Sequence, residues 1–295
     1  ARRLQCGDEG GLLRQALDHF PIREMAERIW QRYYIPGGKA PDAPFKSKPV
    51  PNMNPGRALV ELTVVANFVE VWLAKRGHIG PIGLNLLEKI QIPTLPSLYG
   101  AMLAKVDTIL MGAGIPRAIP GVLEKLARGE RAELPIACTG NDQATVSFDP
   151  ADFGSASLPR PKFYAIVSSN SLATMLAKKC QPPVDGFIIE ASTAGGHNAP
   201  PRGTMMLSDG GEPIYGDRDI PDLAKIAELG LPFWLAGTFG TNEKFKEALA
   251  SGAQGVQIGT GFAFCEESGL REDLKRRVID LVLEGKTSVF THPLP

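Results

Sequence analysis

From residue 58 onward, short apolar runs alternate with amphipathic stretches along this chain. Such alternation is typical of βα units, in which helices connect parallel strands. Most of the apolar runs lack strict polar alternation, as expected of strands that are covered on both faces. We expect strands at Leu59–Thr63, Ile82–Leu87, Val106–Gly112, Phe163–Ser168, Gly186–Glu190, Pro232–Gly237 and Gly255–Gly259. We expect helices at Ala66–Arg76, Leu98–Lys105, Ser171–Lys179, Ile220–Leu229 and Asn242–Ser251.

The number of strands favours a closed barrel. An eighth strand, at either His78–Pro81 or Leu134–Cys138, would complete a (β/α)8 TIM barrel, a fold of typically ~250 residues. An open doubly wound sheet is the alternative. It is disfavoured because no GxGxxG follows the first expected strand and the glycine-rich turns come late in the chain. The sequence therefore predicts an α/β fold with a TIM barrel over residues 58–295.

Two regions fall outside the βα pattern. Residues 1–57 hold one amphipathic segment, Ile22–Tyr33, followed by a proline-rich loop, and we expect an N-terminal helical and loop extension that packs on the barrel. Residues 113–162 are too many for a single βα connection. Long connections in compact folds are usually functional, so this stretch is predicted to be a lid or a small substrate subdomain.

Charge and composition exclude several classes of function. Lys and Arg number 32 and Asp and Glu number 32, so the chain lacks the basic excess of a nucleic-acid-binding protein. No apolar run reaches the ~20 residues that span a bilayer, and no apolar signal segment follows the first charged residues. The four cysteines are scattered, which indicates neither a metal site nor a disulfide framework. We expect a cytoplasmic protein without a membrane or nucleic-acid partner.

The segment GFIIEASTAGGHNAPPRG, residues 186–203, carries the strongest local signal for chemistry. It places His197 beyond the C-terminal end of a strand, where catalytic groups lie in barrels. Gly195 and Gly196 let backbone amides approach a ligand closely, and an imidazole exchanges protons near neutral pH. The alternative is a structural histidine in a glycine loop.

The last two expected strands end in similar loops. Gly237 is followed by Thr238, Gly240 by Thr241, and Gly259 by Thr260. Backbone amides, threonine hydroxyls and a helix N-terminus can bind a phosphate without a basic residue, and barrels commonly bind phosphate at this position. The alternative is that these glycines serve only as turn residues. A phosphorylated small molecule is therefore compatible with zero net charge.

Three segments together resemble the nitronate monooxygenase family, also called 2-nitropropane dioxygenases. They are DGFIIEASTAGGHNAP, LPFWLAGTFGT and GVQIGTGFAFCEESG, and IGLNLL, VDTILMGAGIP and YAIVSSNSLATMLAKK match as well, so that the resemblance covers roughly residues 58–270. It implies a barrel that binds FMN. FMN-dependent enoyl reductases of fatty-acid synthesis are related and share the AGGH and late phosphate segments.

The resemblance also implies roles for individual residues. His197 would be the active-site base or proton donor, and Gly195, Gly196, Asn85 and Ser168 would contact the flavin. The FMN phosphate would be bound by Gly237, Thr238, Gly240, Gly259 and Thr260, and the substrate pocket would include Met111, Gly114 and Ile115. No metal is implied.

The function implied by the resemblance is oxidation of an alkyl nitronate with dioxygen to a carbonyl compound and nitrite. One alternative is reduction of an enoyl thioester with NAD(P)H. Another is a catalytically degenerate binding barrel, suggested because LVELTVVAN at 59–67 replaces the proline and methionine turn that usually ends the family's first strand. The sequence does not decide whether the protein forms a homodimer. Two polar clusters are expected to have plainer roles. Tyr215, Asp217, Arg218 and Asp219 are interpreted as a salt-bridged surface loop in preference to a substrate-binding group, and Lys275, Arg276 and Arg277 as a solvated helix face.

Overall fold

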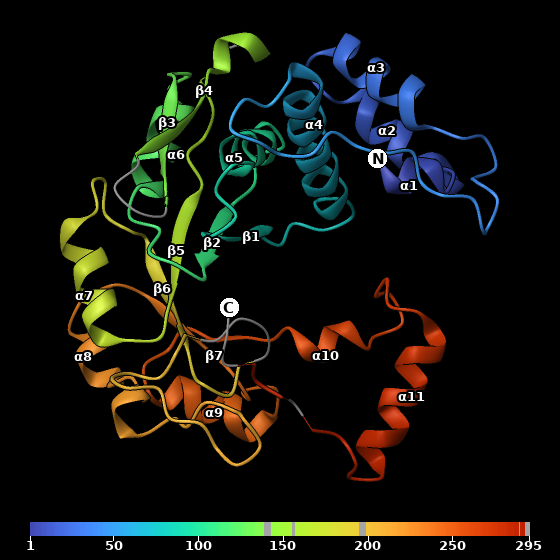
Figure 1. Ribbon diagram of the computed structural model, residues 1–295. Coiled ribbons are helices and arrows are strands. Elements are labelled where there is room, and N and C mark those ends of the chain that lie inside the picture. The colour runs from blue at the N-terminus through green and yellow to red at the C-terminus, as the bar shows by residue number, and fades with distance from the viewer. Residues whose placement is uncertain (139–142, 155–156, 195–198, 289, 293–295) are drawn as a thin grey trace. The chain divides into compact units, whose positions relative to one another are not determined.

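The computed structural model describes residues 1–138, 143–154, 157–194, 199–288 and 290–292 (Figure 1). The chain divides into two compact units. The first contains Ala1–Phe163 and Cys180–Pro182, and the second contains Tyr164–Lys179 and Pro183–Pro295. Each unit has its own elements and its own buried residues.

The first unit begins with helices. They are α1 (Arg2–Gln5), the 3-10 turn η1 (Glu9–Gly11), α2 (Leu12–Asp18), α3 (Arg23–Tyr33) and α4 (Arg57–Ala74). The helix expected at Ile22–Tyr33 is confirmed as α3. The strand expected at Leu59–Thr63 is wrong, because these residues form the first turns of α4. Their valines favour a strand locally, but buried positions recur at helical spacing through Leu62, Val65 and Val69, and this packing decides the conformation.

Two parallel strands follow in the first unit. β1 (Gly83–Leu87) pairs with β2 (Thr108–Gly112), and the buried helix α5 (Thr94–Leu103) connects them. Gly100 of α5 leaves no room for a Cβ against the backbone of Val64, so α5 and α4 approach each other closely.

Residues 113–162 contain regular structure of their own. They form α6 (Ile119–Ala127), the hairpin strands β3 (Ala132–Ile136) and β4 (Ala144–Phe148), and the turn η2 (Pro150–Phe153). β3 overlaps the expected strand at Leu134–Cys138, but it pairs antiparallel with β4, and His78–Pro81 forms no strand. The buried ring of Tyr99 lies 5.1 Å from that of Phe148, which packs the hairpin on α5. A lid role for this region stays a prediction.

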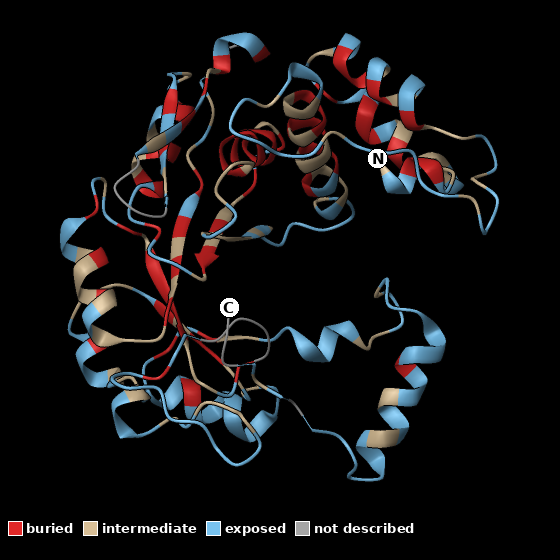
Figure 2. Ribbon diagram, viewed as in Figure 1, coloured by how far each residue is buried: buried red, intermediate tan, exposed pale blue. Residues whose placement is uncertain are grey.

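The second unit contains parallel strands in the order β5 (Lys162–Val167), β6 (Gly186–Glu190), β7 (Phe233–Ala236) and β8 (Val256–Gln257). Its helices are α7 (Asn170–Lys179), α8 (Leu223–Ala227), α9 (Asn242–Ala250), α10 (Thr260–Ala263) and α11 (Glu272–Leu283), with the turn η3 at Asp217–Asp219. Burial is concentrated on β5, β6 and β7, whereas α11 is mostly exposed (Figure 2).

The predicted α/β class is confirmed, since parallel strands alternate with helices in both units. Closure into an eight-stranded barrel stays a prediction. Within the described residues, no helix is long and apolar enough to cross a membrane.

A buried carboxylate ties α4 to its neighbours in the first unit. The side chain of Glu61 is 7% exposed and accepts hydrogen bonds from Arg28 of α3 at 2.8 Å and from Arg57 at 2.9 Å. Burial alone would raise the pKa of Glu61, but the two guanidinium groups outweigh it and lower the pKa below its usual value. The ionised form is therefore stabilised in the folded protein.

We predict that Glu61→Ala lowers the free energy of unfolding by about 2–4 kcal/mol at pH 7, because buried charge-assisted hydrogen bonds are lost. The loss should shrink as the pH falls below about 4, where the unfolded carboxylate is protonated. The measurement is urea unfolding at both pH values. Glu70→Ala on the same helix is the control: the pair Arg3–Glu70 is exposed on both sides, so the loss should stay under about 1 kcal/mol. Equal losses in the two variants would contradict the assignment.

Candidate functional site

The candidate site lies where the parallel strands of the second unit end. The register pairs Glu190 of β6 with Ala236 of β7, and Ala236 with Gln257 of β8. Because the strands are parallel, their carboxyl ends meet at one edge, where ligands bind in α/β proteins. The three loops that carry the predicted site residues therefore leave the sheet side by side.

The loop after β7 packs against the loop after β6. Gly237 has φ +99°, and a Cβ there would lie 3.0 Å from the backbone nitrogen of Ala194. Thr238 also has a positive φ, +57°, and its hydroxyl oxygen lies 3.4 Å from that of Thr193. Gly237 is needed here for both its backbone conformation and its lack of a side chain.

Two helices begin next to these strand ends. Gly240 precedes Thr241, whose hydroxyl accepts a hydrogen bond from the amide of Lys244 and caps the nine-residue helix α9. Gly259 and Thr260 are exposed at the start of α10. Between the two loops, the side-chain oxygen Oε1 of Gln257 is buried without a hydrogen-bond partner in the described part of the chain. Such an acceptor is costly to bury unless a donor reaches it.

A small polar cavity opens beside the end of β6. It measures about 20 Å³, and it is lined by Ser168, Glu190, Ala191, Ser192, Ala199, Pro200, Arg202, Tyr215 and Asp219. Burial raises the pKa of Glu190 to about 7, so its carboxyl is populated in both protonation states at neutral pH. Strongly shifted carboxyls in clefts are candidates for functional groups.

The loop over this cavity is held by hydrogen bonds to backbone groups. Asp219 accepts from the amides of Arg202 and Gly216, each at 2.8 Å, and Tyr215 donates to the carbonyl of Ala199 at 3.1 Å. The guanidinium of Arg202 donates to the carbonyl of Ser168 at 3.3 Å. The polar residues at 215–219 therefore contribute to a cavity wall, which their interpretation as a salt-bridged surface loop missed.

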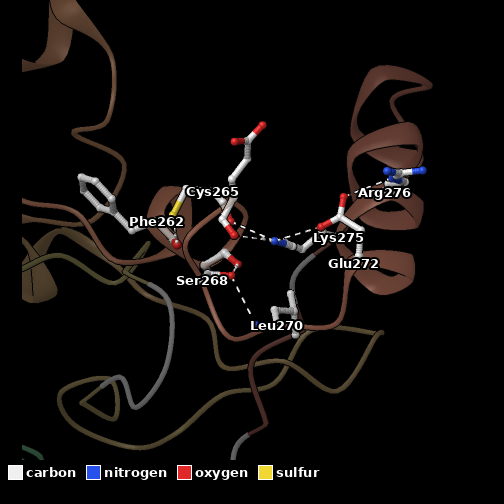
Figure 3. Close-up of polar contacts among 9 residues, drawn as sticks. Phe262, Cys265, Ser268, Leu270, Glu272, Lys275 and Arg276 are labelled. Atoms are coloured by element: carbon white, nitrogen blue, oxygen red, sulfur yellow. Dashed lines mark hydrogen bonds and ion pairs between the residues drawn. The ribbon is translucent and has the colours of Figure 1, made fainter. Parts of the chain in front are cut away.

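A buried lysine fixes the segment that follows the Gly259 loop (Figure 3). Lys275 of α11 is 4% exposed and donates to the carbonyls of Cys265 and Glu266, at 3.1 and 3.2 Å. It also pairs with Glu272 at 3.1 Å. The expected solvated helix face is therefore wrong for Lys275, although Arg276 is exposed. The end of α10 is anchored to α11 through this side chain.

We predict that Lys275→Met increases amide hydrogen exchange of residues 260–268 by about tenfold or more. Met fills a similar volume but cannot donate to the two carbonyls, and each lost bond to a charged donor is worth about 1.5–3 kcal/mol. Arg276→Met is the matched control, because Arg276 makes one exposed pair with Glu272. Its effect should stay within about twofold. Similar exchange in both variants would show that Lys275 does not hold the segment.

The remaining predicted residues lie in different surroundings. Gly195, Gly196 and His197 lie outside the described residues. In the first unit, Asn85 is exposed on β1, Ile115 is 58% exposed and Met111 is fully buried. Gly114 packs against the side chain of Glu88 so closely that a Cβ would not fit. The roles of all these residues stay predictions. The described residues contain no cluster of His, Cys, Asp and Glu that could bind a metal ion.

Sequence reasoning missed Glu190 as a functional residue. The signal was present in the segment GFIIE, where a carboxylate ends an otherwise apolar strand at the edge predicted to carry the site. The other residues that line its cavity lie up to 29 positions away in the sequence, at Asp219, so no local pattern predicts that Glu190 is partly buried there.

Comparison with known proteins identifies the family. Residues 134–291, more than half of the chain, match the nitronate monooxygenase family. The chain belongs to this family. The nitronate monooxygenase match includes β6, β7, β8 and the loops described above. It confirms the resemblance carried by the AGGH and late phosphate segments.

Individual relatives match shorter parts of their own length. A probable nitronate monooxygenase of Bacillus subtilis is 34% identical over 97 residues, which cover 33% of this chain and 26% of the relative. A protein of Mycobacterium tuberculosis named (3aS,4S,5R,7aS)-5-hydroxy-7a-methyl-1-oxo-octahydro-1H-indene-4-carboxyl-CoA dehydrogenase is 30% identical over 101 residues, 34% of this chain and 25% of the relative. The matches thus span about a quarter of these curated relatives.

Among solved structures, FabK from Thermotoga maritima is similar with a TM-score of 0.47 and 18% sequence identity. The similarity covers 74% of this chain and 53% of FabK. The structure of a point mutant of the same protein gives the same TM-score over 73% of this chain and 55% of its own.

Proposed function

We propose that this member of the nitronate monooxygenase family is an FMN-dependent oxidoreductase that oxidises alkyl nitronates with dioxygen to a carbonyl compound and nitrite. The observation that carries the proposal is the Gly237–Thr238 loop, which leaves β7 at the edge where β6 and β8 also end. Membership of the family supports an oxidoreductase.

The residues at this edge fit FMN. The Gly237 loop packs on the loop after β6 with no room for a Cβ, and α9 begins just beyond Gly240. Amides and a helix N-terminus of this kind suit a phosphate dianion. The unpaired Oε1 of Gln257 suits a donor such as a ribityl hydroxyl. Gly237, Thr238, Gly240, Gly259 and Thr260 would hold the phosphate.

The chain's own residues would then bind and orient the substrate and exchange its protons. His197 is proposed as the base or proton donor, with Gly195 and Gly196 giving it access to the ligand. Asn85 and Ser168 are proposed contacts of the flavin, and Met111, Gly114 and Ile115 are proposed substrate contacts. When bound, FMN would supply the electron transfer.

A second candidate is reduction of an enoyl thioester with NAD(P)H, and Glu190 favours it. Addition of a hydride to a carbon–carbon double bond must be completed by a proton. A carboxyl with a pKa of about 7 holds such a proton at neutral pH. A nitronate is already the deprotonated form of its nitroalkane, so its oxidation does not require a proton donor at the start.

We predict that Gly237→Ala weakens FMN binding at least tenfold. The added Cβ would crowd the amide of Ala194 at 3.0 Å and strain a backbone with φ +99°. Gly252→Ala is the matched control, because Gly252 also has a positive φ, +87°, but its added Cβ would meet nothing closer than 3.9 Å. Flavin fluorescence titration gives both affinities. Equal affinities in the two variants would contradict a phosphate site at Gly237.

The reaction is tested on the purified holoprotein. We expect a visible flavin spectrum, either as isolated or after reconstitution with FMN. The holoprotein is then mixed anaerobically with an alkyl nitronate and, separately, with NADPH. Bleaching of the flavin by the nitronate alone is the result expected of the oxygenase, and rapid bleaching by NADPH is the result expected of the reductase.

Failure to bind FMN under any of these conditions would overturn both candidates. If neither compound bleaches the flavin, both proposed reactions are overturned, while the proposal that the protein binds FMN stands. His197→Ala should retain FMN and lose turnover, which is measured by comparing flavin content with rate. Unchanged turnover would remove His197 from the mechanism.

A further inference from the structure

Glu190 occupies a distinctive position in the second unit. It ends β6, it is half-buried, and no hydrogen bond or ion pair holds its carboxyl among the described residues. By contrast, the buried Glu61 of the first unit is held by two arginines. A buried carboxyl without such a partner is destabilised in its charged form, so a purely structural role does not account for it.

The cavity beside Glu190 has the size of a water site. A water molecule needs a cavity of roughly 10–15 Å³ and several polar partners. The cavity provides about 20 Å³, and Ser168, Ser192 and Tyr215 are among its polar lining residues. One water molecule fits, and it would connect the carboxyl with the polar loop at 199–219.

Charged and titratable groups from each neighbouring segment face this cavity. Arg202, Tyr215 and Asp219 come from the loop that follows β6, whereas β5 contributes Ser168 just beyond its end, which is uncharged. The register partner of Glu190 on β7 is Ala236, also uncharged. Arg202 and Asp219 thus bring one charge of each sign to the cavity wall, and burial is the cause that raises the pKa of Glu190.

Glu190 also lies next to two of the proposed flavin contacts. Ser168 lines the same cavity, and Gly237 directly follows Ala236, the register partner of Glu190. Neighbouring strands lie ~4.8 Å apart, so the Glu190 backbone is within ~10 Å of the Gly237 loop, a distance over which charges still interact at ordinary salt. Ser168, a proposed contact of the flavin ring, lines the same cavity as Glu190, so a change of charge on a bound flavin would be felt at Glu190.

We propose that Glu190 is the proton-exchange group of the flavin site: it takes up one proton when the flavin is reduced and releases it when the flavin is oxidised. The proton passes between the carboxylate and solvent through the water in the cavity. One O–H bond forms on the carboxylate while one breaks on the water, which is replenished from bulk. The electrons come from the reductant, dithionite in the test below and NADPH or nitronate in the proposed reactions.

The pH range follows from the sign of the interaction. In the protein without flavin, burial raises the pKa of Glu190 to about 7, and we take this as the starting point for the oxidised state. Two-electron reduction that brings only one proton to the flavin leaves it with one more negative charge, which raises the pKa of Glu190 further because like charges disfavour ionisation. Below pH 7 the carboxyl is protonated in both redox states and takes up nothing. Above pH 7 reduction brings a proton onto Glu190, and this makes the flavin potential fall more steeply with pH.

The test is an anaerobic spectroelectrochemical titration of FMN-loaded protein from pH 5.5 to 9, with dithionite as reductant. We expect wild type and Glu190→Gln to have equal potentials at pH 6. Above pH 7 the wild-type potential should fall faster by up to about 30 mV per pH unit, the tenfold proton ratio for one extra proton per two electrons. Glu228→Gln, an exposed carboxyl at the end of α8 in the same unit, is the control and should follow wild type.

The inference rests on the proposed flavin binding, and the two fail in different ways. Protein that binds no FMN at any pH overturns the proposed function. FMN-loaded wild type and Glu190→Gln with the same pH dependence overturn the role of Glu190 and leave the proposed function intact.

A second variant covers the case in which Glu190→Gln does not retain FMN. Arg202→Met removes the cation that lines the cavity, so the carboxylate loses a favourable neighbour. The onset of the steeper region should then move to higher pH than in wild type. An onset that does not move would overturn the proposal.

Discussion

The parallel register of β6, β7 and β8 is the constraint on which the candidate site depends. It places Glu190, Ala236 and Gln257 in one row across three strands, although they are separated by 46 and 21 positions in the sequence. Backbone hydrogen bonds define this row independently of the side chains. The strand ends and the loops that follow them can therefore carry different groups, a carboxyl at Glu190, a glycine turn after Ala236 and an amide at Gln257, without changing how the strand ends meet.

The positions of these strands could be predicted from the sequence, because each strand has a local pattern of apolar residues. The expected strands that became β6, β7 and β8 lie within two residues of the observed ones, since short apolar runs between turn residues are a local signal. The strand predicted at Leu59–Thr63 was wrong for the opposite reason. Its β-branched residues favour a strand, but contacts with α2, α3 and α5 bury one face at helical spacing, and no sequence window contains those partners.

Two buried carboxyls show why charge at a site is harder to predict than secondary structure. Glu61 and Glu190 are both removed from water, yet the pKa of Glu61 is lowered and that of Glu190 is raised to about 7. The difference lies in the partners, because Arg28 and Arg57 reach Glu61 while no described side chain pairs with Glu190. Arg57 is four residues from Glu61 and could be foreseen, whereas Arg28 and the cavity at Glu190 depend on tertiary packing.

The raised pKa of Glu190 is compatible with the proposal that a phosphate binds at the neighbouring strand end. A phosphate held by backbone amides has no cation beside it to offset a nearby carboxylate, and two like charges in a site of low polarity repel strongly. With its pKa near 7, Glu190 can be uncharged while a dianion binds one strand away, and it can ionise when the local charge changes. Zero net charge, amide-based anion binding and a titrating carboxyl are then parts of one electrostatic arrangement.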